Sequence, residues 1–352
     1  MPFKFSFFVA ITVAVVFAFS CSQNKIIHKP LTEPPKKITR KQTKSNELQL
    51  TFHGENEQAS FSPSGDFVTY ISKNRYQHTN QQVYQINLDT LQSERVTYQD
   101  GQASSPIYSD NGKSIIYSST TDEIKENPLF IYNRLHAMNQ VTDRGVASVK
   151  AHSGSDLQPF ELYKKNLITD NFLRLTNNPY LDKNPSVFSF RNQMLFTSVR
   201  HGNLEIYSYR PGLPNSPIRL TFSDLMDDEA QYSPNSREYV WVRYGQNSKY
   251  SQIMFGNRFS LERKEISFGN NFHINPKWHP NGEYIYFSAT GPNHKNYQLY
   301  TMKKDGSCKT RLTFNDDSDT QPAIDPNSKY VVFTRNKNLF KLNLKEPKCS
   351  ET

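Results

Sequence analysis

Acidic side chains gather in a few short polar segments of this sequence, and most of these segments follow a Leu-Thr-like pair. The acidic residues are Glu55, Glu57, Asp100, Asp182, Asp224, Asp227, Asp228, Glu229, Asp316, Asp317 and Asp319, and only Lys183 opposes them there. Clustered carboxylates can bind a cation or attract a basic peptide or protein. Because Asp also favours turns and solvent for local reasons, ordinary solvated loops are the alternative interpretation.

Signals for enzymatic chemistry are weak in the rest of the chain. The sequence has no Gly-x-Ser-x-Gly nucleophile motif and no Gly-rich phosphate-binding loop. Its nine histidines are scattered, with no closely spaced pair. We therefore expect a protein that is not an enzyme and that carries no cofactor and no metal.

The N-terminal residues have the pattern of an export signal. Lys4 precedes an uncharged, mostly apolar run of 15 residues, at positions 5–19. This length suits the apolar region of a signal peptide better than a membrane span, which needs about 20 residues. We therefore expect residues 1–20 to be a signal peptide.

The apolar run ends in Ala18-Phe19-Ser20-Cys21. A small residue before a cysteine resembles the lipobox of bacterial lipoproteins, and this resemblance implies a lipid on Cys21. By the same resemblance, Ser22 at the next position implies attachment to the outer membrane of the bacterial cell envelope. Ordinary signal cleavage before Cys21 is the alternative, since a small-x-small site precedes the same bond.

Most of the positive charge lies directly after this signal. The chain has 42 Lys+Arg against 33 Asp+Glu, a formal charge of +9, and residues 22–47 hold seven basic and two acidic residues. This stretch also contains three prolines and little apolar periodicity, so residues 21–47 are predicted to be the lipidated cysteine and a disordered basic tether. Because the remainder is nearly neutral, the sequence argues against nucleic-acid binding.

The remainder of the chain is one unit repeated six times. A typical copy, Pro276-Lys277-Trp278-His279-Pro280-Asn281-Gly282, joins a short strand to a tight turn, and an aromatic strand follows. The turns end at residues 65, 112, 192, 236, 282 and 328, so the spacing is 44–47 residues except for one interval of 80. A regular period of this length is typical of repeat folds.

Each copy contains four predicted strands. The second strand, for example, is expected at residues 67–72, 114–119, 194–198, 239–243, 284–288 and 330–334. Four antiparallel strands per repeat predict an all-β fold, a six-bladed β-propeller over residues 48–345, followed by a tail at 346–352. The last copy lacks its fourth strand, and a matching strand at residues 48–52 precedes the first copy. We expect this strand to complete the last blade and close the ring.

The repeats resemble the WD-like β-propeller repeat of the TolB family, whose pattern is Pro-x-Trp-Ser-Pro-Asp-Gly followed by an aromatic strand. Residues 59–65 and 276–282 are the closest copies, and the resemblance covers about residues 48–344. It implies a TolB-like role at the cell envelope, although such propellers serve many functions. Because 26 residues separate Cys21 from Leu48, we expect the α/β domain that precedes the TolB propeller to be absent.

Propeller topology places the acidic segments on one face. Strands alternate in direction, so loops from the fourth strand of one blade to the first strand of the next share a face with the loops between second and third strands. We call this the upper face. We expect its carboxylates to bind an envelope protein or peptide, including a peptidoglycan-associated one, while the lipid anchor contacts the membrane.

The alternative function is a carbohydrate-active lyase or hydrolase that uses a metal in the central mouth of the propeller. Some propeller lyases of similar repeat hold a metal through His from several blades. His201, His273 and His294 are the residues that could converge in this way.

Two further features fall outside the regular repeat. Residues 121–155 form an insertion between the second and third strands of blade 2, where a long loop suggests a role in partner contact or capping, with an unstructured insertion as the alternative. Cys308 and Cys349 are expected at the opposite, lower rim in adjacent blades. A disulfide between them is predicted for an oxidising compartment, and two free thiols are the alternative.

Overall fold

Aromatic and β-branched residues form strands throughout the described part of the chain. The structure is a computed structural model, and it describes residues 46–344 except 77, 100, 122–159, 189–192, 211–216 and 261. The predicted signal peptide, nearly all of the tether, most of the insertion and the C-terminal tail therefore lie outside the described residues. No helix in the described ranges has the length and apolar character needed to cross a membrane.

The described residues form six four-stranded antiparallel sheets, as the sequence predicts. The innermost strands are β2 (Glu55–Phe61), β6 (Ala103–Tyr108), β10 (Asp182–Phe188), β14 (Met226–Tyr232), β18 (His273–Trp278) and β22 (Asp319–Ile324). The second strands are β3 (Phe67–Lys73), β7 (Ser114–Ser119), β11 (Gln193–Ser198), β15 (Glu238–Tyr244), β19 (Tyr284–Gly291) and β23 (Tyr330–Arg335). These bounds confirm the second strands expected from the repeat.

The outermost strand of each blade is shorter than the other three, at two or three residues. The third strands are β4 (Gln82–Asn87), β8 (Glu161–Asn166), β12 (Glu205–Tyr209), β16 (Ser251–Asn257), β20 (His294–Lys303) and β24 (Asn338–Asn343). The outermost strands are β5 (Ser93–Arg95), β9 (Phe172–Arg174), β13 (Ile218–Arg219), β17 (Arg263–Glu265), β21 (Thr310–Arg311) and β1 (Glu47–Gln49). A short 3-10 turn at Gln246–Ser248 joins β15 to β16.

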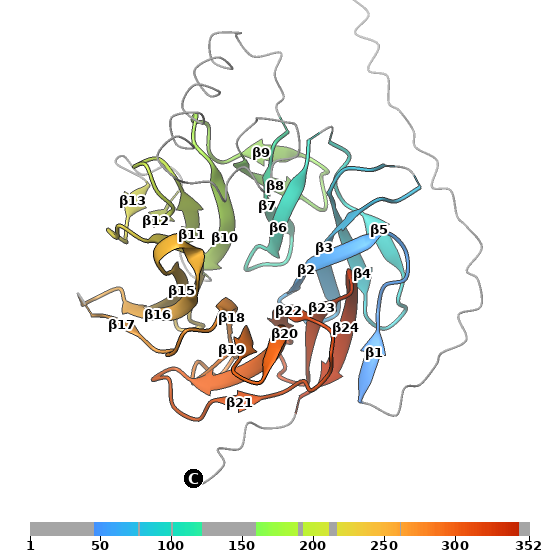
Figure 1. Ribbon diagram of the computed structural model, residues 1–352. Helices are drawn as coiled ribbons and strands as arrows, with labels where there is room; N and C mark the ends of the chain where they lie inside the picture. The colour runs from blue at the N-terminus through green and yellow to red at the C-terminus, as the bar shows by residue number, and fades with distance from the viewer. Residues whose placement is uncertain are drawn as a thin grey trace, which may run out of the picture. The chain divides into compact units, whose positions relative to one another are not determined.

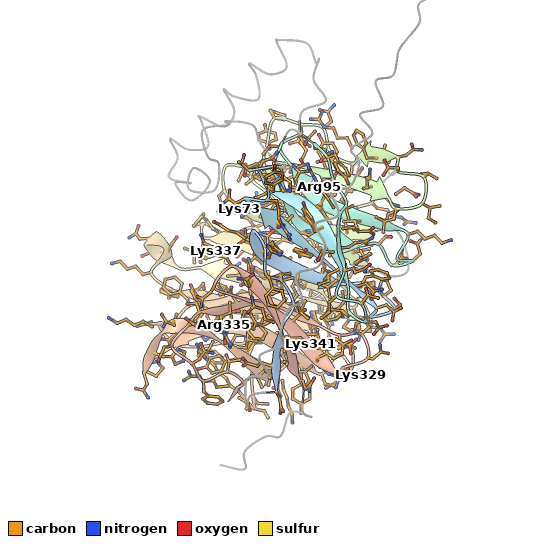
Figure 2. The ribbon with its side chains drawn as sticks, turned by 90° about the vertical axis from the view of Figure 1, so that its right-hand side faces the viewer. Lys73, Arg95, Lys329, Arg335, Lys337 and Lys341 are labelled. Atoms are coloured by element: carbon orange, nitrogen blue, oxygen red, sulfur yellow. The ribbon has the colours of Figure 1, made fainter. Side chains whose placement is uncertain are left out.

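The blades are arranged in a ring around a central channel (Figure 1). The innermost strand of each blade contacts that of the next, and β22 of the last blade contacts β2 of the first. The ring closes as the sequence predicts, because β1 pairs antiparallel with β24, with Leu48 opposite Lys341. Figure 2 views the molecule from the side where β1 lies in this last blade.

A Thr or Ser after each outermost strand ties that strand to its neighbour. Its hydroxyl oxygen accepts a backbone N–H of the third strand at 2.8 to 3.0 Å in all six blades. The six residues are Thr97, Thr176, Thr221, Ser267, Thr313 and Thr51. Thr51 comes from the N-terminal segment and fills the same position in blade 6, so the closing strand reproduces the full blade motif.

The core lies between neighbouring blades. The second strands contribute its largest side chains, and Tyr70, Tyr117, Trp241, Phe287 and Phe333 are almost fully buried. Because a second strand is covered on both faces, it is apolar along most of its length rather than at every other residue. This packing holds the inner strands, and therefore the channel side chains, in fixed positions.

Candidate functional site

The central channel is lined by one bulged residue from the innermost strand of each blade. The six residues are Gln58, Ser105, Asn184, Glu229, Asn275 and Gln321, all with φ between 51° and 58°. At each of them the register with the second strand shifts, which marks a β-bulge. A non-glycine residue in this backbone region costs roughly 1–2 kcal/mol, so six equivalent cases need compensating contacts.

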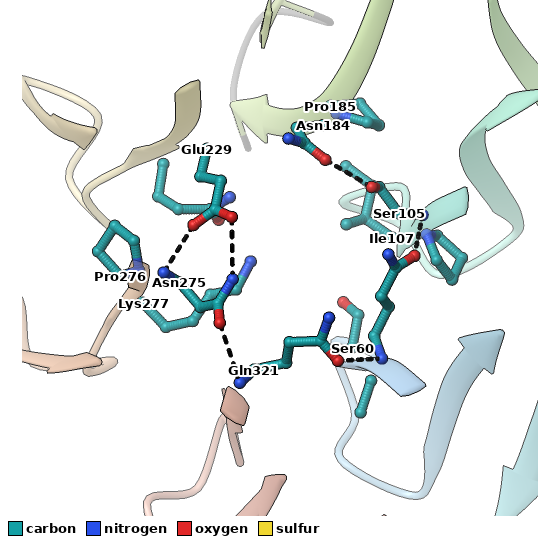
Figure 3. A pocket seen from close by; sticks show the side chains of 14 residues that line it. Ser60, Ser105, Ile107, Asn184, Pro185, Glu229, Asn275, Pro276, Lys277 and Gln321 are labelled. Atoms are coloured by element: carbon teal, nitrogen blue, oxygen red, sulfur yellow. Dashed lines mark hydrogen bonds between the residues drawn. The ribbon is translucent and has the colours of Figure 1, made fainter. Parts of the chain in front are cut away.

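Hydrogen bonds around the channel supply these contacts (Figure 3). The ring of blades has six pairs of neighbours. In four of these pairs, the backbone N–H of one bulged residue donates to the side-chain oxygen of the bulged residue in the preceding blade. The pairs, donor first, are Gln58 to Gln321 at 3.0 Å, Ser105 to Gln58 at 2.6 Å, Asn275 to Glu229 at 2.6 Å and Gln321 to Asn275 at 3.2 Å. In the other two pairs of neighbouring blades the hydrogen bonds join side chains. The Ser105 hydroxyl donates to the Asn184 amide oxygen, and the Asn184 amide NH2 donates to the Asp228 carboxylate.

These residues surround a cavity of about 100 Å³. Among the residues that line this cavity, two are charged. Glu229 belongs to the hydrogen-bonded ring, and Lys277 lies outside it and points toward the channel from β18 (Figure 3). Nearby, Lys183 Nζ contacts Asp228 Oδ2 at 2.7 Å. The charged groups of the channel therefore come from blades 3 to 5, and the cavity residues from blades 6, 1 and 2 are neutral.

Burial shifts the protonation equilibria of these groups. Burial and the adjacent Asp228 raise the pKa of Glu229 to about 7. Burial lowers the pKa of Lys277 to about 8, while Glu229 opposes this change. The pKa of Asp228 is lowered, because Lys183, Thr197 and Asn184 together outweigh the effect of its burial. At neutral pH the channel wall thus carries a mixture of charges rather than a purely acidic one.

Three of the predicted partner-binding acids are completely buried in ion pairs with an arginine. Asp182, Asp227 and Asp319 are completely buried. They pair with Arg200 at 2.9 Å, Arg243 at 2.8 Å and Arg335 at 2.5 Å, respectively. The expectation that Lys183 alone opposes the acidic residues is therefore wrong, because each arginine comes from the end of the neighbouring second strand or the residues just after it.

The other predicted acids have different surroundings. Asp228 is also buried, and Glu229 belongs to the channel ring. Glu55 pairs with Lys73 at 3.2 Å and with Lys337 at 3.1 Å, and Glu57 accepts a hydrogen bond from Gln81. Asp224, Asp316 and Asp317 are exposed on the upper face, whereas Asp100 lies outside the described residues. The role of the exposed acids in partner binding stays a prediction.

Sequence reasoning missed a set of exposed aromatic rings on the same face. In five blades, an aromatic residue directly follows the Thr or Ser that comes after the outermost strand. The exposed fraction of these aromatic side chains lies between 46% and 76%. These are Phe52, Tyr98, Phe222, Phe268 and Phe314. In three of them an arginine stacks on the ring at 4.6 to 4.8 Å from its centre. The signal was present in the sequence as a repeated Leu-Thr-Phe-like triplet.

The three histidines proposed as metal ligands do not converge. His201 bonds to Tyr207 and His294 bonds to Tyr300, each within its own blade. His273 is completely buried, with Nδ1 at 3.0 Å from the Ser251 carbonyl oxygen and Nε2 at 2.9 Å from Lys309 Nζ. Within the described ranges, no three His, Cys, Asp or Glu residues gather as metal ligands would.

The cysteines and the insertion are only partly described. Cys308 is disulfide-bonded, and because Cys349 lies outside the described residues, its pairing with Cys308 stays a prediction. The insertion begins after β7 and ends before β8, the place that the repeat predicts, and its structure lies outside the described residues.

One buried carboxyl group predicts a pH-dependent stability. Glu161, at the start of β8, is completely buried, and burial together with Asp182 raises its pKa to about 7. The folded protein therefore holds this proton more tightly than the unfolded chain does. The resulting stabilisation is present at acidic pH and is lost as the pH rises from about 4.5 to about 7.

We expect Glu161→Gln to raise the free energy of unfolding by about 2 kcal/mol at pH 8, and to change it little at pH 4. Glutamine already occupies the equivalent position in three blades, as Gln82, Gln252 and Gln298, where it bonds to the loop backbone. Denaturant unfolding at both pH values measures the change.

Glu205→Gln is the matched control. Glu205 is the equivalent residue of blade 3, but Arg219 Nη2 lies 2.7 Å from its carboxylate, whereas the ion pair of Glu161 with Arg174 spans 3.7 Å. Removing this closely paired charge should destabilise the protein at pH 8. Equal effects of the two substitutions would contradict the assignment of the raised pKa to Glu161.

Comparisons with known proteins agree with the propeller fold. No family model matches the chain, and no curated protein matches it. TolB from Acinetobacter baumannii is similar in structure, with a TM-score of 0.55 and 18% identity, over 84% of this chain and 65% of that protein, less than two thirds of its length. A putative TolB from Agrobacterium tumefaciens gives a TM-score of 0.58 and 15% identity, over 79% of this chain and 90% of that protein.

An oligogalacturonate lyase from Vibrio parahaemolyticus is also similar, with a TM-score of 0.53 and 12% identity, over 86% of this chain and 81% of that protein. The chain therefore has a TolB-like six-bladed propeller fold. Because TolB and a lyase share this architecture, the fold alone does not choose between binding and catalysis.

Proposed function

We propose that this chain is a non-catalytic binding propeller of the bacterial cell envelope. A lipid on Cys21 holds it at the outer membrane, and its upper face captures a partner protein or peptide. The observation that carries this proposal is the set of exposed aromatic rings at equivalent positions of five blades.

Exposed aromatic side chains are costly to leave in water and are frequent at the centre of protein interfaces. On this face, Arg95, Arg219 and Arg311 stack on Tyr98, Phe222 and Phe314, and the backbone carbonyl two residues on accepts a hydrogen bond from each arginine. The rings are thereby ordered before any partner arrives, which lowers the entropic cost of binding.

Charge adds a preference among partners. Asp316 and Asp317 are exposed in the loop that begins with Phe314, and Asp224 is exposed two residues after Phe222. Each of these loops therefore presents an apolar ring beside a carboxylate. This combination favours a partner with basic groups around an apolar contact.

The anchoring proposal rests on the sequence. The lipobox-like segment ends at Cys21, and the basic tether that follows can approach anionic lipid headgroups. Such a tether keeps the propeller near the membrane while the upper face remains accessible to envelope proteins.

The test compares capture of envelope proteins by crosslinking with purified variants. We expect Phe314→Ala combined with Asp316→Lys and Asp317→Lys to lower capture about tenfold, since loss of one interface aromatic commonly costs more than 1 kcal/mol. Phe259→Ala combined with Glu262→Lys is the matched control, because Phe259 is equally exposed but lies in a turn between third and fourth strands.

Undiminished capture by the upper-face variant would place the binding surface elsewhere. In the same experiment, Cys21→Ser should move the protein from the membrane fraction to the soluble fraction without changing capture by the purified chain. Retention of the Cys21→Ser chain in the membrane fraction would contradict the lipid anchor.

A further inference from the structure

The ammonium group of Lys277 differs from the other charged groups of the channel in its contacts. Lys183 is paired with Asp228, and both oxygens of the Glu229 carboxylate accept hydrogen bonds from Asn275. Lys277 makes no hydrogen bond and no ion pair with any described residue, although it lines the cavity from within the propeller. An ammonium group that is largely removed from water is costly unless an acceptor faces it.

Two glutamine amide groups line the same cavity. The Gln321 oxygen accepts the backbone N–H of Gln58, and the Gln58 oxygen accepts the backbone N–H of Ser105. Because a backbone N–H can only donate, these contacts fix which end of each amide is the oxygen. The NH2 groups therefore lie on the other side, and Figure 3 shows that of Gln321 directed into the cavity.

Neither NH2 group donates to any described residue, so the cavity offers donors without matching acceptors. Lys277, Gln58 and Gln321 come from blades 5, 1 and 6 and border one space. The carboxyl group of Glu229 does not cancel the charge of Lys277, because it is already engaged by Asn275 and its raised pKa leaves it only partly ionised near neutral pH.

The size and charge of the cavity limit the ligand. A volume of about 100 Å³ holds a few water molecules or one small organic group. One ammonium and two neutral amides match the single charge and the two oxygens of a carboxylate, whereas a phosphate dianion usually needs more cationic donors.

We propose that Lys277, Gln58 and Gln321 form a carboxylate-binding site in the central channel. The carboxylate belongs either to a small free acid or to the end of a peptide that enters the channel. This site goes beyond the proposed partner surface and does not depend on it, because it involves none of the exposed rings or acids of the upper face.

The experiment is calorimetric titration of the full chain at pH 7 with sodium acetate and, separately, with acetamide. We expect acetate to bind in the millimolar range and acetamide not to bind. Lys277→Met keeps the length and apolar character of the side chain and should weaken acetate binding at least tenfold. Lys329→Met is the matched control, since Lys329 (Figure 2) is exposed and does not line the cavity, so its loss should leave binding unchanged.

A second arm separates the two sources of the carboxylate. A short peptide with a free C-terminal carboxylate is compared with the same peptide amidated at its C-terminus. Tighter binding of the free-acid peptide than of acetate, lost in Lys277→Met, identifies a peptide terminus as the ligand. Acetate binding without a gain from the peptide identifies a free acid.

Two results would overturn the proposal. One is equal acetate binding by the parent and by a Lys277→Met chain whose melting curve shows a native fold. The other is an absence of binding by both acetate and the free-acid peptide. Because the proposed partner surface does not include Lys277, the Lys277→Met chain should capture partner proteins as well as the parent does. Failure of the carboxylate site therefore changes acetate binding, and failure of the proposed function changes partner capture.

Discussion

Removal of residues 46–51 is expected to lower the free energy of unfolding by about 5 kcal/mol or more, a large part of the stability of an ordinary domain. Within this segment Leu50 is almost fully buried and packs with Val68, Tyr70 and Leu339. Its backbone N–H donates to the Leu339 carbonyl at 2.8 Å, and Thr51 accepts the Leu339 N–H at 2.9 Å. The deletion removes these contacts and exposes the edge of β24.

Thermal unfolding followed by circular dichroism measures the effect, and a melting temperature lower by about 10 °C or more is expected. Two point variants separate loss of the buried contacts of this segment from a general effect of changing it. Leu50→Ala should cost about 2–5 kcal/mol because it leaves a cavity in the core, while Phe52→Ala, two residues on and half exposed, should cost much less. Cooperative melting of the deletion variant at the parent temperature would show that the ring does not depend on its closing strand.

The repeat pattern made most of the fold predictable from the sequence. Its signals are local: Pro and Asn or Gly in the turns, aromatic residues in the second strands, and Leu-Thr at the end of the outermost strands. The unaccompanied strand before the first repeat indicated closure for the same reason, since Thr51 carries the motif that the last blade lacks. Nothing in this prediction required knowledge of contacts between blades.

The burial of the acidic residues was not predictable from single loops. Asp182 and Asp316 look alike in the sequence, yet the first is completely buried and the second is exposed. The difference depends on position within the repeat, because Asp182, Asp227 and Asp319 each lie two residues before a bulged channel residue. Comparison of the repeats could have found this, since the same three blades carry an arginine at or just after the end of the second strand.

The channel donors were not predictable at all. In a regular strand, successive residues point to opposite faces of the sheet. The bulge shifts this alternation by one residue in every innermost strand. Gln58 and Gln321 therefore look like ordinary strand residues until the register is known. Lys277 lies within the turn motif that indicates the fold, and nothing in that motif distinguishes its side chain as one that lines the channel.

The second large effect is expected for Arg335→Met. The Arg335 side chain contacts Asp319 at 2.5 Å and Glu47 at 2.7 Å, so it joins the innermost strand of blade 6 to the closing strand. Asp319 is completely buried, and these two carboxylates raise the pKa of Arg335. Removal of the guanidinium leaves a buried carboxylate without its cation, which commonly costs about 3–5 kcal/mol. Denaturant unfolding at pH 7 measures this loss.

Lys337→Met is the matched control, because Lys337 lies near Arg335 on the same side of the molecule (Figure 2). Its ion pair with Glu55 spans 3.1 Å at an exposed position, so its loss should cost less than about 1 kcal/mol. Adding Asp319→Asn to Arg335→Met should recover part of the stability, since the neutral Asn56 occupies the equivalent position in blade 1. If the double variant is no more stable than Arg335→Met alone, the cost comes from lost packing of the arginine and not from the uncompensated charge of Asp319.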